Sequence, residues 1–380
     1  MRHIPLTDAA LNQVLGEWSL PPGEGGLLAL LPEAEKDQLP RLQAACRQHG
    51  LALAGAIFPA LIVGQRFVTH GVWLLPQRNM PAHFLIPALN QPDGSPIGRV
   101  VEAVRAGLAV RGAGEAKPTL YMFFDGMVPN VASLLDGAYL ELANRVEYAG
   151  VNAGSESFQP MPCLFDANRL VGDGVLGLLL PNTAAPALAH GFVQPERAMS
   201  ATATEGNRIA SIDWRPAFEV YQEVIKAQFG IELTRDNFYE YAVHFPLGMV
   251  RASGDVVVRI PVALTDDGAL YCVGEIPENA MLVLLQAPAA AGNACLEQLA
   301  GDLRQAHGAQ PGGRLLTFYC AGRRMHLGSA AESELADLHA ATGCGEMAGA
   351  LSLGEIGSTV RGGYPMFHNA TLVCSPWGDA

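Results

Sequence analysis

The first half of the chain alternates between short apolar runs and clusters of glycine and proline. Such runs are typical of β-strands, which are short and are bounded by turn residues. One helix is predicted at residues 40–49, where Gly50 follows as a left-handed terminator. A strand, a helix and a strand in succession favour α/β layering, whereas the later, closely spaced strands favour antiparallel pairing, so we predict a mixed sheet. The predicted strands of this half are residues 26–32, 51–63, 71–75, 119–124, 175–180 and 200–212.

A segment rich in glycine, proline and arginine interrupts this pattern at residues 90–116. It contains one predicted helix, near residues 97–107. Because the helix lies between two predicted strands, it is either a crossover within the sheet or an excursion over the surface. The sequence leaves both alternatives open.

The second half carries longer amphipathic stretches. We predict a boundary near Asp213, whose side chain can cap the helix that follows and that ends at Gly230. Asp266-Asp267-Gly268 predicts the tight turn of a hairpin between residues 255–260 and 269–273. Ser329-Ala330-Ala331-Glu332 predicts a capping box for a helix that ends at Gly343. The other predicted elements are the strands 281–285, 314–320, 348–353 and 366–374 and the helix 290–307.

The predicted fold class is therefore α/β, of mixed α+β character, with two domains. The chain has 380 residues, and domains average roughly 150 residues. We place the domains at residues 1–212 and 213–380, each with a mixed β-sheet flanked by helices. The tripeptide Gly-Glu-Ile occurs at 274–276 and again at 354–356, which is a weak indication of an internal repeat.

Charge and hydropathy argue against two classes of binding partner, nucleic acids and membranes. The chain has 24 Lys and Arg against 37 Asp and Glu, a net charge of −13. A chain this acidic is a poor ligand for phosphate backbones, so we expect no binding to nucleic acid. The longest strongly apolar stretches, such as 175–181, are far shorter than the roughly 20 residues that cross a bilayer. We therefore expect no membrane association.

The seven cysteines are scattered, with no C-x-x-C pair. This spacing disfavours a structural zinc site or a thioredoxin-like motif. The N-terminus also lacks the basic and apolar regions of a secretory leader. We therefore expect free thiols in a reducing compartment and a cytoplasmic location.

The sequence contains little evidence for a catalytic motif. Residues 172–177 match G-x-G-x-x-G, but an apolar strand follows in place of the helix that would face a pyrophosphate. The chain contains no G-x-S-x-G and no H-E-x-x-H sequence. We therefore expect a protein that is not an enzyme. An enzyme without a familiar signature stays as a further alternative, with Cys344 as the thiol to test as its nucleophile.

None of the ten histidines pairs with another at helical spacing, so no metal site of several histidines is visible. A single imidazole can still ligate haem iron, because the porphyrin supplies four donors. His70, His190 and His244 neighbour apolar residues and are the candidate axial ligands, one of the three. His307 and His339 lie near predicted helix C-termini, where a cationic imidazole is favoured by the dipole.

Several motifs together resemble the FIST sensory domain family, over nearly the whole chain. The resemblance implies an N-terminal FIST domain to about Ile212 and a C-terminal one beyond it. His368 lies in the closing motif and is expected to hold the fold. The similar segments are 173–181, 204–207 leading into 215–217, 245–248 followed by 258–262, 266–270 leading into 274–280, and 354–358 followed by 366–372.

The resemblance implies a sensory module that binds a small molecule, for which amino acids are proposed in the family. FIST domains are often fused to signalling proteins or encoded near them. Because no such segment follows Ala380, this chain is expected to signal to a separate partner. One group of stand-alone bacterial FIST proteins carries haem, senses nitric oxide and regulates histidine kinases.

The sequence is compatible with two classes of ligand. In both, the ligand is enclosed between two packed halves of the chain. In the first, the cofactor is haem, nitric oxide weakens the axial bond, and the partner is a signalling protein such as a histidine kinase. In the second, the ligand is an amino acid or another small metabolite. Its candidate ligand-binding residues are polar residues inside the FIST-like motifs, namely Arg259, Glu275, Glu355 and Asn369. Whether the chain forms a homo-oligomer is left open.

Overall fold

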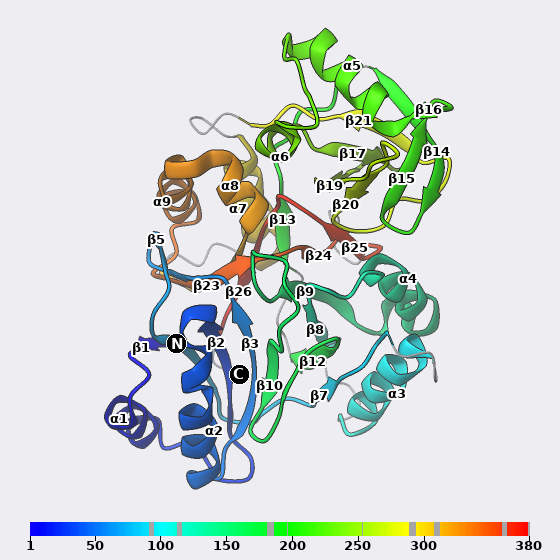
Figure 1. Ribbon diagram of the computed structural model, residues 1–380. Coiled ribbons are helices and arrows are strands. Elements are labelled where there is room, and N and C mark those ends of the chain that lie inside the picture. The colour runs from blue at the N-terminus through cyan, green and yellow to red at the C-terminus, as the bar shows by residue number, and fades with distance from the viewer. Residues whose placement is uncertain are drawn as a thin grey trace.

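Three six-stranded mixed sheets and one antiparallel sheet form the framework of the protein (Figure 1). The predicted mixed α+β class is thereby confirmed. No helix among the described residues is long and apolar enough to span a membrane. The computed structural model describes residues 1–90, 95–111, 116–180, 186–195, 197–252, 254–288, 294–307, 312–358 and 363–378.

The first sheet is built on two parallel strands, β2 and β3, joined through α2. Strand β6 pairs antiparallel with β2, and β1 lies outside β6. A hairpin, β4 and β5, leaves this unit after β3. The elements of the first unit are β1 (Arg2–Ile4), α1 (Asp8–Trp18), β2 (Gly26–Pro32), η1 (Glu33–Gln38), α2 (Leu39–Gln48), β3 (Ala52–Phe58), β4 (Leu61–Val63), β5 (Arg66–Val68) and β6 (Val72–Gln77).

The second unit repeats this order of elements. Its parallel pair is β8 and β9, joined through α4, and β12 and β7 follow on the side of β8. The helix predicted near residues 97–107 is α3. It connects β7 to β8 of the same sheet, so it is a crossover and not an excursion over the surface. The elements are β7 (His83–Ile86), α3 (Pro96–Ala109), β8 (Thr119–Asp125), α4 (Val131–Leu142), η2 (Ala143–Arg145), β9 (Glu147–Ala153), β10 (Leu164–Asp166), β11 (Leu170–Val171) and β12 (Val175–Leu180).

The third unit repeats the order once more, around the parallel pair β22 and β23. Strands β26 and β13 follow on the side of β22. A separate antiparallel sheet is inserted between β13 and α7. The elements are β13 (Ala187–Ala189), α7 (Ala294–His307), β22 (Arg314–Cys320), α8 (Ala321–Leu327), η4 (Gly328–Ala330), α9 (Ala331–Thr342), β23 (Glu346–Ser352), β24 (Glu355–Gly357), β25 (Met366–His368) and β26 (Leu372–Pro376).

The three units are interlocked, because each gives its hairpin to the sheet of another. Strand β4 of the first unit pairs with β23 of the third, and β24 of the third pairs with β9 of the second. Strand β10 of the second unit pairs with β3 of the first. The three sheets consequently have the same strand order, and we call them together the three-sheet body.

One glycine recurs at the same place in all three units. In each unit it is the fourth residue of the second parallel strand and follows an alanine. The three glycines are Gly55, Gly150 and Gly349. A Cβ atom there would lie 2.5, 2.1 or 1.6 Å from the carbonyl oxygen of the residue opposite. The repeated Ala-Gly is therefore a sequence trace of the threefold repeat. The two Gly-Glu-Ile tripeptides occupy non-equivalent places and do not mark it.

The inserted sheet is antiparallel throughout and nearly closes into a barrel. Its two end strands, β18 and β19, are separated in sequence by Ile260 alone. The buried face of α5 packs into the barrel core. The elements are β14 (Ala198–Glu205), β15 (Arg208–Ile212), β16 (Arg215–Pro216), α5 (Ala217–Phe229), α6 (Phe238–Tyr241), η3 (Ala242–His244), β17 (Leu247–Val250), β18 (Val256–Arg259), β19 (Pro261–Leu264), β20 (Leu270–Cys272) and β21 (Met281–Leu284).

The helix ends agree with the sequence better than the helix starts do. Gly50, Gly230 and Gly343 all have positive φ directly after a helix, as predicted. The two predicted N-caps are wrong. Helix α5 begins after Pro216 without a side-chain cap, because the Asp213 carboxylate accepts from the Ser200 amide instead, at 2.8 Å. Helix α9 begins after Ala330, also without a side-chain cap, and the Glu332 carboxylate accepts from the Phe67 amide.

The hairpin predicted in the second half is partly wrong. Asp266-Asp267-Gly268 does form a tight turn, but this turn joins β19 to β20. Strand β18 pairs with β17 instead. Turn residues indicate where the chain reverses, whereas the partner of a strand depends on packing elsewhere in the barrel.

Candidate ligand site

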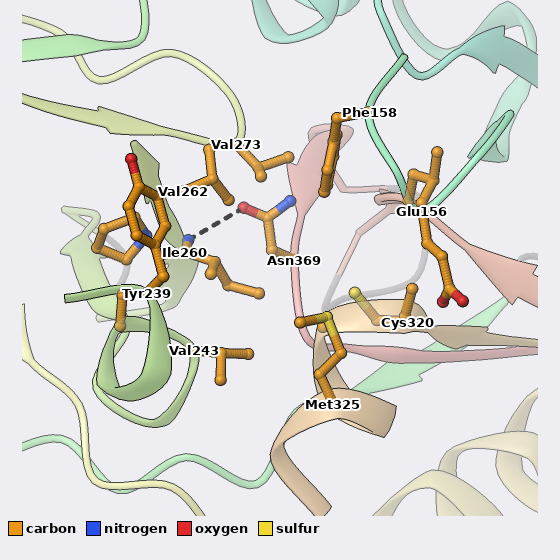
Figure 2. Close-up of a pocket in the computed structure, with 15 residues that line it drawn as sticks. Glu156, Phe158, Tyr239, Val243, Ile260, Val262, Val273, Cys320, Met325 and Asn369 are labelled. Atoms are coloured by element: carbon orange, nitrogen blue, oxygen red, sulfur yellow. Dashed lines mark hydrogen bonds between the residues drawn. The ribbon is translucent and has the colours of Figure 1, made fainter. Parts of the chain in front are cut away.

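A cavity of about 230 Å³ lies between the barrel and the three-sheet body. Figure 2 shows barrel residues on one side of it, residues of α8 and of the loop after β9 on the other, and Asn369 between them. The barrel contributes Tyr239, Ala242, Val243, Ile260, Pro261, Val262 and Val273, and the body contributes Glu156, Phe158, Cys320, Ala321, Gly322, Met325, Leu353 and Asn369.

The cavity lies at the carboxyl ends of the parallel strands β22 and β23. Cys320 is the last residue of β22, and Leu353 directly follows β23. In sheets with parallel strands, ligands bind outside these carboxyl ends, where the connections to the following helices diverge. The barrel covers this edge, so a ligand here contacts both parts of the molecule.

Asn369 is the polar side chain most deeply buried in the wall, with 1% of its surface exposed. Its Oδ1 accepts from the Ile260 amide at 3.4 Å, and its Nδ2 donates to the His368 carbonyl at 3.0 Å. A carboxamide has two donor hydrogens and two acceptor positions, so each end can form one further bond. Asn369 can therefore both donate to and accept from a ligand.

The polar groups behind the cavity are neutral. Burial raises the pKa of Glu355 to about 8, although Ser352 and Thr371 donate hydrogen bonds to its carboxyl group. Burial also raises the pKa of the Cys320 thiol far above its usual range. The Cys320 sulfur accepts from the Ala370 amide at 3.0 Å. At neutral pH the Cys320 thiol in the wall is therefore protonated, and the Glu355 carboxyl group behind it is mostly so.

The entrance is apolar and includes strained backbone. Phe158, Tyr239 and Met325 are 40%, 64% and 57% exposed and come from three different elements. Glu156, the one charged residue among the described lining residues, forms an ion pair with Arg324 at 2.6 Å. Phe158 at the entrance and the buried Ala370, which follows Asn369, have φ of +53° and +52°, values uncommon for residues with a side chain and frequent at functional sites.

A buried ion pair fixes the helix that carries one wall. Arg323 of α8 donates to both carboxylate oxygens of Glu334 in α9, at 2.6 and 2.7 Å. It also donates to the carbonyl oxygens of His190 and Ala370. Tyr319 donates its hydroxyl hydrogen to Glu334 at 2.6 Å. These bonds hold the start of α8 against the segment after β25, which brings Cys320 and Asn369 to one cavity.

The four polar residues predicted as ligand contacts lie in three places. Asn369 lines the cavity, and Glu355 is fully buried behind it. Arg259 and Glu275 line a different, smaller cavity. Because Arg259 and Ile260 are consecutive on an extended chain, their side chains point to opposite faces. The structure therefore does not bring the four residues together around one ligand.

The three candidate haem ligands are also outside the cavity wall. His190 accepts from the Phe192 amide at 3.0 Å, and burial lowers its pKa to about 4. Nδ1 of His244 lies 2.7 Å from Nδ1 of His326. His70 is exposed, and its carbonyl oxygen contacts the His3 ring. Among the described lining residues none is a histidine, so the cavity does not fit haem through any of the three.

Two other residues that the sequence singled out, His368 and Cys344, do not line the cavity. His368 is fully buried in β25 opposite Glu355, as expected of a residue that holds the fold. Burial raises the pKa of the Cys344 thiol, and Cys344 lies away from the cavity wall. The described part of the chain contains no cluster of three or more histidine, cysteine or acidic side chains suited to a metal ion.

Sequence reasoning missed most of the cavity wall. Phe158, Cys320 and Leu353 come from three segments outside the FIST-like motifs, whereas Ile260, Val262 and Asn369 lie within them. One signal was available: Cys320 ends a predicted strand that precedes a helix. Such strand ends form ligand sites in α/β folds.

Two domain families match this chain in succession. The FIST N domain matches residues 29–215, and the FIST C domain matches residues 217–358. No curated protein matches the chain.

Proposed function

Because this chain belongs to the FIST family, with a FIST N domain followed by a FIST C domain, we propose that it is a sensory protein whose cavity binds a small, uncharged ligand. The observation that carries this proposal is the place of the cavity, between the barrel and the carboxyl edge of β22 and β23. A molecule in that place contacts both parts, and its binding free energy favours the arrangement in which they are closed.

The chemistry of the wall indicates the class of ligand. Ile260, Val262 and Leu353 offer apolar surface, and Asn369 offers one donor and one acceptor. A free amino acid would bring two charges into this wall, and the described lining residues hold no unpaired charge to compensate them. The volume of about 230 Å³ is below the roughly 300 Å³ at which drug-sized pockets begin. We therefore propose a neutral ligand of few atoms with one polar group.

The signal would pass to a separate signalling protein, such as a histidine kinase. The family membership supports a signalling role, and the exposed Phe158, Tyr239 and Met325 support the cavity entrance as the surface that ligand binding alters. Large exposed apolar side chains gathered at one place are typical of interaction sites.

The test is to identify what the protein carries and then to fill the cavity. Mass spectrometry of small molecules released from the purified protein should find a neutral compound. Val262→Phe should remove it, because the added ring occupies the cavity. Leu264→Phe is the matched control, since Leu264 lies on the same strand, is also half-buried and does not line the cavity. Equal retention of the compound by both variants would contradict the proposal.

Haem is the alternative ligand that the sequence suggested, and the protein would then sense nitric oxide. Its test is the absorption spectrum of the protein after addition of haem. A Soret band that His70→Ala, His190→Ala or His244→Ala abolishes would favour haem over the neutral ligand. A band that all three substitutions leave unchanged would remove these histidines as axial ligands.

A further inference from the structure

Arg259 is a buried cation that forms no ion pair with any residue that the structure describes. It is 1% exposed, and burial lowers its pKa only to about 10, so it stays charged at neutral pH. Its Nε donates to the Glu275 carbonyl at 3.0 Å, and its Nη1 donates to the carbonyls of Val258 and Phe367 at 3.1 and 2.8 Å. Within the described residues, Nη2 has no acceptor and no carboxylate forms an ion pair with the guanidinium. A buried charge left in this state is unfavourable.

Two carboxylates, Asp136 and Glu275, line the same space, and neither forms an ion pair with Arg259 among the described residues. The Glu275 carboxylate accepts from the amide of Ser133 at 3.0 Å and also from its hydroxyl. Asp136 accepts from the Tyr364 hydroxyl at 2.7 Å. Arg251 adds a second positive charge and, among the described residues, has no ion-pair partner either. The side chains that meet here therefore include two guanidinium groups that form no ion pair with any described residue.

These side chains line a cavity of about 70 Å³ that adjoins a wider groove of about 580 Å³. Both spaces are lined by Met249, Arg251, Pro277 and Met366. The inner space suits one small polar group, and the outer space is within the range of ordinary ligand pockets. The groove is lined in part by methionine and proline, which suit hydrocarbon, and in part by polar residues that include Asp255, Glu278 and Tyr364.

We propose that the inner cavity binds the carboxylate of a small monocarboxylic acid, held by Arg259 and Arg251, with its hydrocarbon chain in the groove against Met249 and Met366. Arginine hydrogen bonds to carboxylates are charge-assisted and stronger than neutral ones. The site is separate from the cavity of the proposed function, since Arg259 and Ile260 face opposite sides of the same chain segment.

The site also spans the boundary between barrel and body. Arg259 belongs to β18 and bonds the carbonyl of Phe367 in β25, and Glu275 bonds Ser133 in α4. A carboxylate here would neutralise the guanidinium groups at the junction. Binding of the acid is therefore expected to stabilise the contact between the two parts.

The experiment uses the full chain and ligand-observed NMR with butyrate, acetate and 1-butanol at constant ionic strength. Butyrate should bind saturably and roughly fifteenfold more tightly than acetate, because two more methylene groups are buried. 1-Butanol, which lacks the charge, should not bind. Arg251→Met should weaken butyrate binding by about tenfold or more. Arg251 is only half-buried and forms no ion pair among the described residues, so this variant should fold.

Arg66→Met is the matched control, because Arg66 is exposed, also lacks an ion pair in the described residues, and lies elsewhere. It should bind butyrate as the parent chain does. Val262→Phe, which fills the first cavity, should also leave butyrate binding intact, so the two proposals fail separately. Absence of saturable butyrate binding, or binding that Arg251→Met leaves unchanged, overturns the carboxylate site. Loss of binding in Val262→Phe alone would do the same, since it would place butyrate in the first cavity.

Discussion

The Ile260 amide donates a hydrogen bond to the Asn369 side chain at 3.4 Å, and this bond joins the barrel to the three-sheet body on the wall of the cavity. Ile260 is the single residue between β18 and β19, where the barrel comes nearest to closing. Asn369 directly follows β25. The contact therefore links the junction of the barrel strands with a segment of the body.

Asn369→Leu should weaken both this junction and the binding of the cavity ligand. The Ile260 amide loses its side-chain acceptor, so the free energy of unfolding should fall by about 1 kcal/mol. The compound released from the purified protein should also decrease, because its polar group loses a partner. Urea unfolding and quantitative mass spectrometry measure the two effects. Asn207→Leu is the control, since Asn207 bonds the Cys272 carbonyl away from the cavity; a loss of ligand in this variant as well would argue against a specific role for Asn369.

Glu355→Gln should change how stability depends on pH. Burial raises the pKa of Glu355 to about 8, so the folded protein keeps a proton that the unfolded chain releases near its ordinary value of 4.5. Between these two values the parent chain should lose up to about 1.4 kcal/mol of stability per pH unit from this group, with no further loss above the folded pKa. Glutamine does not titrate, so the stability of Glu355→Gln relative to the parent should rise steadily across this window. Thermal unfolding at a series of pH values gives the difference, and a difference that is flat with pH would show that Glu355 is ionised in the folded protein.

The buried ion pair between Arg323 and Glu334 should be far more costly to break than to replace. Arg323→Met leaves the Glu334 carboxylate buried without its partner and should lower the free energy of unfolding by about 3–5 kcal/mol. The double variant Arg323→Met/Glu334→Gln removes the unpaired charge and should regain a large part of that loss. Urea unfolding of the single and double variants measures this coupling. Equal stabilities of the Arg323→Met and double variants would mean that the carboxylate is not the source of the loss.

Gly349→Ala should disrupt the third unit, because the new Cβ would lie 1.6 Å from the Thr317 carbonyl oxygen. The two parallel strands would have to separate, and we expect a loss of about 3 kcal/mol or more. Gly301→Ala is the matched control: Gly301 lies in α7 with no atom within 4 Å of the added Cβ. That variant should gain roughly 0.5–1 kcal/mol from helix propensity. Thermal unfolding compares them, and similar small effects at both sites would contradict the close approach at Gly349.

Local features of the chain could be predicted well. The apolar runs at 26–32, 119–124 and 314–320 are strands, and Gly50, Gly230 and Gly343 follow helices with positive φ. These features depend on a few neighbouring residues, so the sequence pattern is sufficient to find them. The FIST-like motifs likewise led to the family that the domain matches confirm. The Ala-Gly pairs at 54–55, 149–150 and 348–349 could not reveal the threefold repeat, because the same dipeptide occurs at six other places in the chain.

Long-range arrangement was decided by the tertiary structure alone. A hairpin such as β4 and β5 can pair with any free strand edge, and only the packing of the three units places it on β23. The same holds for side chains. Aspartate is a residue type that commonly caps helices, but Asp213 lies beside Ser200 and accepts a hydrogen bond from the Ser200 amide instead. Arg259 is predicted from the sequence as a ligand contact, whereas the contact of barrel and body buries it and separates it from Asn369.

The sequence by itself thus determined several of the strands, the glycines that end three helices, and the family, whereas the single strands predicted at 51–63, 200–212 and 366–374 are each two strands in the structure. The tertiary structure decided which of these segments meet around the cavity, and which polar residues became buried. The physical reason is range: turn and capping preferences act over a few residues, whereas strand pairing and burial depend on partners more than a hundred residues away, as for Arg259 and Phe367.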